Sequence, residues 1–247
     1  MRKSKEEVAK MRRAGRVVAQ MLEACERAAK PGVTTRELDL IARDVLERNH
    51  ARSNFLNYKG FPAVICTSPN SVIVHGIPSN QPLKDGDILS VDCGAIIEGY
   101  HADAARTFPI GDVDEDAHQL MKVTRASLDA GIEFVRDGAR VSDIGEAVQK
   151  VAEAAGFSVV REYVGHGIGT ALHEEPQVPN YKTNRRGIKL MVGHVLAVEP
   201  MVNMGGPKTE LRDDGWTVVT LDGSLSAHFE DSIAVTENGP EILTRLD

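Results

Sequence analysis

The chain has 247 residues, of which 42% are hydrophobic and 26% are charged, and its formal net charge is −7. These proportions are typical of a folded globular protein, and they exclude collagen, a coiled coil and global disorder. The acidic balance argues against a broad nucleic-acid-binding surface. No run of residues approaches the ~18 consecutive apolar positions of a transmembrane helix. We therefore expect no membrane segment and no specific nucleic-acid site.

The cysteine content and the N-terminal residues indicate in which cellular compartment the protein is expected. Cys25, Cys66 and Cys93 are odd in number and lack the spacing of a zinc ribbon, which fits a reducing environment. The largely charged residues 2–7 are not followed by the apolar segment of a signal peptide. The sequence therefore predicts a cytoplasmic protein.

Two capping boxes predict two helices near the start of the chain. Ser4-Lys5-Glu6-Glu7 and Thr34-Thr35-Arg36-Glu37 each place a hydroxyl three residues before a glutamate. In that spacing each side chain can bind the other residue's backbone N–H group. Apolar residues recur at helical spacing after each box. Pro31-Gly32 is expected to end the first helix.

The same layout returns later in the chain. Asp114 is expected to cap a helix whose apolar stripe runs to Val135 and which Asp137-Gly138 ends. A further helix is expected to start at Ser142-Asp143-Ile144. With an offset of 106 residues, Gly32, which ends the first helix, aligns with Gly138, which ends the later one. We interpret this as a duplication, the alternative being that any two capped helices look alike.

Segments rich in Val and Ile, bounded by Gly, Pro, Asn or Asp, predict strands. They are residues 63–66, 87–95, 100–108, 157–161, 195–199, 216–221 and 228–236. Because helices precede groups of strands and do not alternate with single strands, the pattern favours an α+β fold with antiparallel sheets. We expect a single domain, residues 1–247, made of two related halves at about 1–110 and 111–247.

The segment from Asp92 to Asp103 carries the strongest chemical signal. Glu98-Gly99 is typical of a two-residue hairpin turn. Such a turn places Asp92 opposite Ala105 and makes the two aspartates diagonal neighbours on one face, ~7–8 Å apart at Cα. Two carboxylates at that distance can flank a pair of metal ions. The alternative is a solvated pair on an exposed face, which the apolar flanking residues disfavour because burying an unpaired carboxylate is costly.

Further histidines and carboxylates stand at breaks in the apolar pattern. Glycines bracket His166 in residues 165–169, where they permit close backbone approach and unusual dihedral angles. His173 follows seven residues later, and His75 follows a short apolar run. Glu199 ends one apolar strand and Glu230 precedes another. A lone histidine is more often structural, but the glycines and the second histidine favour a functional His166. Each signal alone is weak. Together they form one set drawn from both halves.

In this order, the set resembles the methionine aminopeptidases over essentially the whole chain. The matching residues are Asp92, Asp103, His166, Glu199 and Glu230, set in Val-Asp-Cys-Gly (91–94), Gly-His-Gly-Ile-Gly (165–169), Val-Glu-Pro (198–200) and His-Phe-Glu-Asp (228–231). The chain resembles the short type I form. The resemblance implies a pita-bread fold, with two α+β halves around a pseudo-two-fold axis. It also implies removal of the initiator methionine from nascent proteins when the next residue is small.

The resemblance further implies a dinuclear metal site. In the family pattern Asp103 and Glu230 bridge two divalent metals. Asp92 completes the shell of one metal, and His166 and Glu199 complete that of the other. Four carboxylates and one imidazole suit Mn or Fe(II) at least as well as Zn, and the family is also active with Co. The identity of the two divalent ions therefore stays open.

Catalytic and substrate-binding residues are carried over in the same way. Glu199 is implied to move protons as well as to bind metal, and His75 and His173 are implied to contact the substrate and the tetrahedral intermediate. The resemblance implies that the methionine pocket consists of Tyr58, Phe61, Cys66, Leu172 and Trp216. The alternative is that these side chains only pack in an ordinary hydrophobic core. Aromatic and polarizable neighbours suit a thioether. The chain departs from the family where Phe61 replaces a common tyrosine and Leu172 a common phenylalanine.

The implied partners are the N-termini of nascent polypeptides at the ribosome exit, and the implied state is a monomer. One alternative is another pita-bread enzyme, such as a proline-specific aminopeptidase or dipeptidase, which usually carries an additional N-terminal domain. A second is a non-catalytic pita-bread protein that binds ribosomes or RNA after losing metal ligands. A third is creatinase-like chemistry. The complete ligand set favours the metal-dependent aminopeptidase, and the charge of −7 also disfavours RNA binding.

Overall fold

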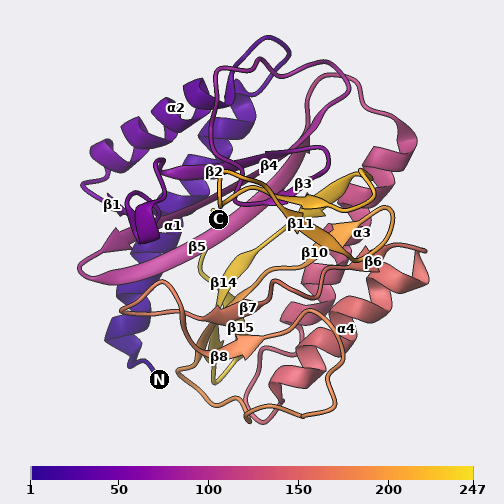
Figure 1. Ribbon diagram of the computed structural model, residues 1–247. Coiled ribbons are helices and arrows are strands. Elements are labelled where there is room, and N and C mark those ends of the chain that lie inside the picture. The colour runs from indigo at the N-terminus through magenta and orange to yellow at the C-terminus, as the bar shows by residue number, and fades with distance from the viewer. Residues whose placement is uncertain (1, 247) are drawn as a thin grey trace.

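The helices form two pairs. Helix α1 (Lys5–Ala28) packs on α2 (Thr35–Arg48), and α3 (Glu115–Ile132) packs on α4 (Val141–Ala154). The computed structural model describes residues 2–246, and in it the two pairs cover opposite sides of the strands (Figure 1). A short 3₁₀ turn, η1 (Tyr58–Gly60), follows α2. None of the described helices is long and apolar enough to cross a membrane.

The predicted helix caps are confirmed. The Ser4 hydroxyl accepts the Glu7 N–H at 3.2 Å, and the Glu7 carboxylate accepts the Ser4 N–H at 2.7 Å. Thr34 and Glu37 make the same reciprocal pair at 3.2 and 2.7 Å. Asp114 accepts an N–H from the first turn of α3 at 2.7 Å. Each cap satisfies backbone donors that have no partner within the helix.

Two helix bounds differ from the prediction. Helix α3 ends before Val135, which packs into the core from the turn that follows the helix. Helix α4 begins at Val141, one residue before Ser142. The reason is that the Asp143 carboxylate accepts the Arg140 N–H at 2.8 Å, which makes Arg140 the cap residue.

The strands form antiparallel sheets, as predicted for an α+β fold. In one sheet β4 (Ile88–Ile97) pairs with β1 (Arg52–Ser53), β2 (Ile65–Pro69) and β5 (Tyr100–Pro109). Another has the order β15 (Gly239–Ile242), β14 (Asp231–Thr236), β9 (Val195–Val198), β7 (Gly165–Gly167) and β8 (Glu174–Val178). Two small sheets have the orders β13 (Ser226–His228), β10 (Met201–Asn203), β6 (Ser158–Val159) and β11 (Thr209–Leu211), β12 (Val218–Thr220), β3 (Val72–Val74).

The β4–β5 hairpin has the predicted register. Glu98 and Gly99 form the turn with φ angles of 50° and 81°, the positive values that a type I′ turn requires. Asp92 pairs with Ala105, and Asp103 therefore pairs with Gly94 on the neighbouring strand. Because side chains alternate between the two faces of a strand, this register points both aspartates to the same side of the hairpin.

Two clusters of buried side chains hold the hairpin and the second large sheet in place. Under α1 and α2 the cluster includes Val18, Met21, Leu38, Leu89 and Val91. Under α3 and α4 it includes Leu128, Ile144, Val148, Leu196 and Ile233. Burying one such large aliphatic side chain stabilises the fold by about 1.5–3 kcal/mol relative to leaving it exposed. Both clusters therefore hold rigidly the strands on which the candidate metal ligands lie.

Every segment predicted as a strand contains strand residues, but the last one is wrong as a continuous strand. It is interrupted at Phe229 and Glu230, between β13 and β14. Glu230 instead pairs with Ala105 of β5 in an isolated bridge, with N···O distances of 3.0 and 3.3 Å. Strands β1, β7, β8, β10, β11 and β15 are absent from the prediction, and β3 was anticipated only by its end beside His75.

Strand pairing also joins the two predicted halves. The bridge between Ala105 and Glu230 ties β5 to the second half of the chain, and β3 pairs with β12. Residues that lie far apart in the sequence therefore meet between the helix pairs (Figure 1).

Candidate metal centre and active site

A cavity of about 220 Å³ brings together the residues that the sequence nominated. Its lining includes the expected metal ligands Asp92, Asp103, His166, Glu199 and Glu230. It also includes Tyr58, Phe61, Cys66, His75, Leu172, His173 and Trp216, which were expected to contact substrate. Phe55 and Lys59 line the cavity too, and the prediction missed them because the chain around them has no helical or strand periodicity.

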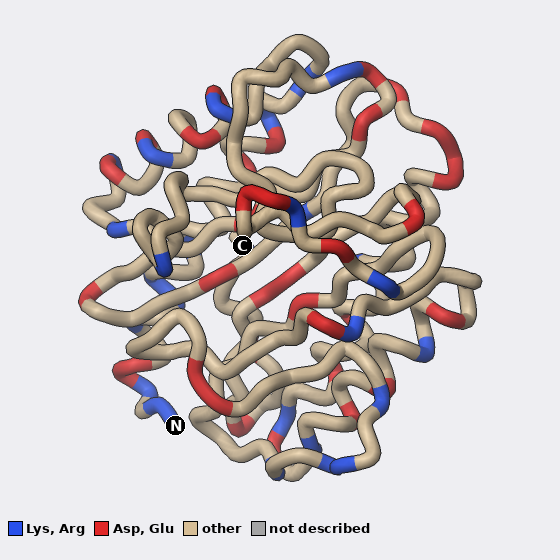
Figure 2. The backbone as a smooth tube through the Cα atoms, in the orientation of Figure 1, with Lys and Arg blue, Asp and Glu red and all other residues tan. Residues whose placement is uncertain are grey.

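The acidic side of this cavity is built on central strands. Figure 2 shows acidic segments along these strands, whereas Lys and Arg lie mostly toward the periphery. Asp103 is only 4% exposed. Its backbone is fixed by Ser232 of β14, whose hydroxyl accepts the Asp103 N–H at 3.0 Å and donates to the Asp103 carbonyl at 2.8 Å. The aspartate of one half is thus held directly by the strand that follows Glu230.

His166 occupies β7, a strand that the sequence did not predict. Its Nδ1 lies 2.9 Å from the Gly167 carbonyl, which leaves Nε2 facing the cavity, 3.6 Å from Glu199 Oε1. The flanking glycines have no positive φ angle, so the expected unusual dihedral angles are wrong. The expected close approach is right: a Cβ on Gly165 would lie 2.3 Å from the Ala197 carbonyl oxygen, and one on Gly167 would lie 2.3 Å from that of Glu175.

The two glutamates are placed at strand ends. Glu199 directly follows β9, and its carbonyl accepts a hydrogen bond from the Asn180 side chain at 3.0 Å. Glu230 lies between β13 and β14 and is 2% exposed. His228, also buried, has its Nε2 4.0 Å from Glu199 Oε2. The break in the predicted strand is therefore what lets Glu230 reach the cavity beside Asp103.

Burial disfavours the charged forms of these carboxyl groups. It raises the pKa of Asp92 to about 7. Burial and the neighbouring negative charges raise the pKa values of Asp103, Glu199 and Glu230 well above their usual range. Buried oxygen atoms of Asp92, Asp103 and Glu230 have no hydrogen-bond partner among the described residues. Raised pKa values and unpartnered oxygens in a group of buried carboxyl groups indicate that no positive charge lies close enough to balance their negative charges.

The donor atoms fit a divalent metal. Ligand atoms of Asp103, His166 and Glu230 lie within 4.8 Å of one another. Burial lowers the pKa of His166 to about 4, so the ring is neutral and its Nε2 can act as a ligand at neutral pH. Unpartnered carboxylate oxygens and a neutral imidazole are the ligands that Mn, Fe and Zn accept. Asp92 and Glu199 line the same cavity and can complete the set.

These pKa shifts predict how the metal-free protein responds to pH. An acid whose folded pKa is raised binds more protons in the folded than in the unfolded state, so stability falls as pH rises toward the folded value. The buried histidines act in the opposite sense, but their unfolded forms have lost most of their protons by about pH 7. Because the pKa values of Asp103, Glu199 and Glu230 are raised well above their usual range, we expect the melting temperature of chelator-treated protein to fall as the pH rises above about 7 and divalent metal to reverse the fall. A flat or rising profile in scanning calorimetry would contradict this.

The histidines His75 and His173 lie on the walls of the cavity. His173 is exposed at its mouth, where its Nδ1 lies 2.8 Å from the Tyr58 hydroxyl and its ring centroid lies 4.3 Å from that of His166. Burial and the Lys59 ammonium lower the pKa of His173, so its ring is neutral at neutral pH. His75 has a φ of 62° and packs edge-on against Trp216.

Apolar side chains form the opposite wall. Phe61 packs edge-on against Trp216 with 5.1 Å between ring centroids, and against Phe55 with 6.4 Å. Cys66 and Leu172 are buried in the same cluster. These side chains leave an apolar recess beside the acids, which is suited to an uncharged substrate side chain.

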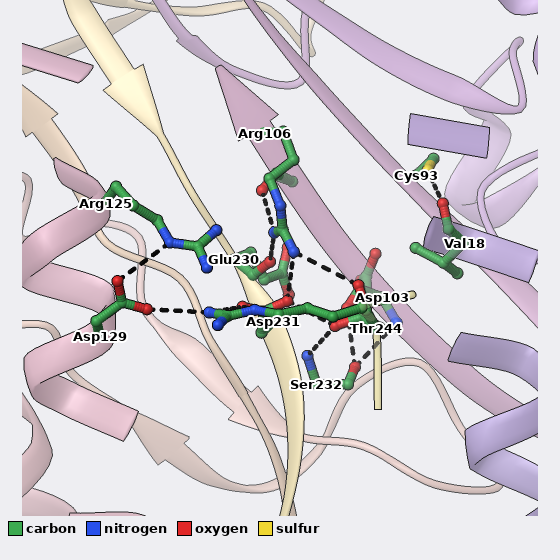
Figure 3. Close-up of polar contacts among 12 residues, drawn as sticks. Val18, Cys93, Asp103, Arg106, Arg125, Asp129, Glu230, Asp231, Ser232 and Thr244 are labelled. Carbon is green, nitrogen blue, oxygen red and sulfur yellow. Dashed lines mark hydrogen bonds and ion pairs between the residues drawn. The ribbon is translucent and has the colours of Figure 1, made fainter. Parts of the chain in front are cut away.

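Arginine side chains bind Asp231, the residue after Glu230, in a network of hydrogen bonds and ion pairs (Figure 3). Arg106 of β5 donates to the Glu230 carbonyl and, at 2.6 Å, to the fully buried Asp231 carboxylate. Arg245 donates to the other Asp231 oxygen at 2.8 Å, and the Thr244 hydroxyl donates to the first at 2.8 Å. These contacts hold the Glu230 carbonyl and the side chain of the next residue, Asp231. This network was not predictable from local pattern, because Arg106 lies more than a hundred residues before Asp231 in the chain.

Comparison with known proteins assigns the family. The model of metallopeptidase family M24 matches residues 9–237. A methionine aminopeptidase of Clostridium acetobutylicum is 51% identical over 243 residues, which is 98% of this chain and 97% of that protein. The chain belongs to the methionine aminopeptidases of family M24. Family M24 consists of metallopeptidases, which agrees with the buried Asp, His and Glu group described above.

Solved structures of M24 proteins confirm the expected pita-bread fold. The crystal structure of methionine aminopeptidase from Rickettsia prowazekii superposes with a TM-score of 0.97 at 44% identity, over 99% of both chains. A prolidase from Pyrococcus furiosus superposes with a TM-score of 0.78 at 20% identity, over 100% of this chain and 66% of its own. At that identity the prolidase shares the fold alone.

Proposed function

We propose that this chain is a metal-dependent aminopeptidase that removes the N-terminal methionine of polypeptides. One observation carries the proposal: the acids and the imidazole that match the family's metal ligands lie in one cavity beside an apolar recess. The ligands come from both parts of the chain: they lie on β4, β5 and β7, directly after β9 and directly before β14. This supports a single catalytic domain built from two halves.

The proposed ligands hold two divalent cations. Asp103, His166 and Glu230 would hold the cations together with Asp92 and Glu199, which line the same cavity. The buried oxygens without partners support this arrangement. When bound, such a pair of cations supplies a hydroxide nucleophile near neutral pH and polarises the scissile carbonyl. The oxygen-rich donor set suits Mn, Fe(II) or Co at least as well as Zn.

Protein side chains do the rest of the proposed chemistry. Glu199 is the proposed proton carrier, since its carboxyl group lies at the cavity beside His166 and can hold or release a proton. His173, held by Tyr58, is placed at the cavity mouth to donate a hydrogen bond to the carbonyl oxygen of the substrate. His75 contacts the substrate from the opposite wall.

The apolar recess is the proposed methionine pocket. Tyr58, Phe61, Cys66, Leu172 and Trp216 line it, and aromatic rings and a thiol are favourable neighbours for a thioether. The cavity of about 220 Å³ leaves little space once a methionine side chain is bound. A small second residue is therefore the proposed requirement. Nascent polypeptides in the cytoplasm, reached at the ribosome exit by a monomeric enzyme, are the proposed substrates.

A panel of peptides tests this specificity against a proline-specific activity on the same fold. We expect Met-Ala-Ser to be cleaved at least roughly a hundredfold faster, as kcat/KM, than Leu-Ala-Ser, Met-Leu-Ser and Ala-Pro-Ala. The second peptide tests the side-chain pocket, the third the requirement for a small second residue, and the fourth the proline-specific alternative. Faster cleavage of Ala-Pro-Ala than of Met-Ala-Ser would overturn the proposal.

A further inference from the structure

The residues ahead of α1 are fitted closely against the segment that carries His173. The Lys3 N–H donates to the Gly193 carbonyl at 2.6 Å, and the Arg2 guanidinium donates to the Val192 carbonyl at 2.7 Å. Gly193 has a φ of 93°, and a Cβ there would lie 2.5 Å from the Lys3 carbonyl oxygen. The turn at 192–193 therefore seats the backbone of Lys3 in one position.

From that seat the Lys3 side chain crosses Gly169 and reaches Glu174. The Lys3 ammonium lies 2.6 Å from Glu174 Oε2, and the two side chains are only 6% and 16% exposed. A Cβ on Gly169 would lie 2.1 Å from Lys3 Cε. Because Gly169, the last glycine of the motif at 165–169, has no side chain, the Lys3 side chain can pack directly against its backbone. Removing either member of an ion pair this buried is costly, because the remaining charge loses an opposite charge at a site with little solvent.

Glu174 uses its other oxygen to hold the loop that ends at His173. Glu174 Oε1 accepts the Thr170 N–H at 2.8 Å and the Ala171 N–H at 3.3 Å. Burial acts to raise the pKa of Glu174, but the Lys3 hydrogen bond and charge together with these N–H groups lower it overall. The carboxylate is therefore charged at neutral pH and closes the loop on the residue next to His173.

We propose that Lys3 is a positioning residue for catalysis, which acts through Glu174 to hold His173 at the mouth of the cavity. The inference rests on the proposed role of His173 and deepens it. Tyr58 holds the His173 ring directly, and the Lys3–Glu174 pair holds the backbone behind it. Neither Lys3 nor Glu174 lines the cavity. Their effect is therefore on the geometry of His173 and not on the binding of metal or of the methionine side chain.

The test compares Lys3→Met and Glu174→Gln, singly and combined, with Lys5→Met as the matched control. Lys5 forms an exposed pair with Glu237 at 3.8 Å, so the control removes an ammonium two residues away without touching the loop. We expect each single variant to lower kcat for Met-Ala-Ser roughly tenfold, with KM and bound metal changed less than about twofold. Hydrogen exchange at the Thr170 amide should quicken in the single variants and stay unchanged in the control.

The combined variant separates coupled from independent roles. Because both changes break the same interaction, the double variant should lose no more kcat than either single variant. Losses that multiply would overturn the proposal, as would a lowered melting temperature with wild-type kcat measured well below it. His173→Ala is measured alongside: wild-type turnover in that variant would remove the proposed role of His173 itself, whereas its inactivity beside a fully active Lys3→Met would overturn only the role of Lys3.

Discussion

Asp103→Asn should bind less than one equivalent of metal and lose roughly a thousandfold in turnover of Met-Ala-Ser, because metal-assisted hydrolysis supplies several kcal/mol of transition-state stabilisation and each 1.4 kcal/mol is about tenfold. Asparagine keeps the shape of the side chain but offers neither the charge nor the second anionic oxygen that a bridging ligand needs. Metal content by plasma mass spectrometry and turnover are measured on the same preparation.

In the metal-free protein, we expect the same substitution to raise stability. Burial and neighbouring charges raise the pKa of Asp103, so removing its carboxylate relieves repulsion among the remaining acids. Metal-free Asp103→Asn should therefore melt at a higher temperature than metal-free wild type above about pH 7. Asp112→Asn, an exposed aspartate outside the cavity, is the control and should match wild type in both respects. Full metal binding by Asp103→Asn would show that Asp103 is not a ligand.

His173→Ala should keep its metal and lose about 10²–10⁴-fold in kcat, the range seen when a positioned acid, base or hydrogen-bond donor is removed. His173 is exposed at the cavity mouth and its Nδ1 is hydrogen-bonded to the Tyr58 hydroxyl, so we expect it to contact the substrate and not a metal ion. Metal analysis, kcat and KM together separate the two roles.

The control for this variant is His118→Ala, which removes an exposed histidine on α3. It should leave metal content and kcat unchanged. A folded His173→Ala protein that has lost its metal would mean that His173 is a ligand and that the division between metal-binding and substrate-contacting residues is wrong. His166→Ala gives the contrasting expected result, with loss of both metal and turnover.

The β4–β5 hairpin was predictable from the sequence because local rules determine it completely. The turn at Glu98-Gly99 sets the register, and the alternation of side chains then puts Asp92 and Asp103 on one face. The helix caps at Ser4, Thr34 and Asp114 were predictable for the same reason. In each case the residues that decide the geometry lie within a few positions of one another.

Strand β7 and the position of Glu230 were not predictable from local pattern. Strand β7 has three residues, two of them glycine, and exists because β8 and β9 supply its partners. Glu230 leaves its predicted strand to bridge to Ala105, more than a hundred residues earlier. The Asp231 arginine network and the Lys3–Glu174 pair also join distant segments. The glycines around His166 and the nearby His173 favoured a functional His166, but only the family resemblance could assign Glu230 a metal-binding role before the fold was known.

The most direct test of the central claim combines product and metal in one experiment. Chelator-treated protein is titrated with Mn(II) or Fe(II) under anaerobic conditions, and free methionine released from Met-Ala-Ser is measured by mass spectrometry while bound metal is measured on the same samples. We expect no release without metal, and release that rises to a plateau as bound metal approaches about two ions per chain. Methionine release at full rate by the metal-free protein would contradict the account, as would a metal-loaded protein that leaves Met-Ala-Ser intact.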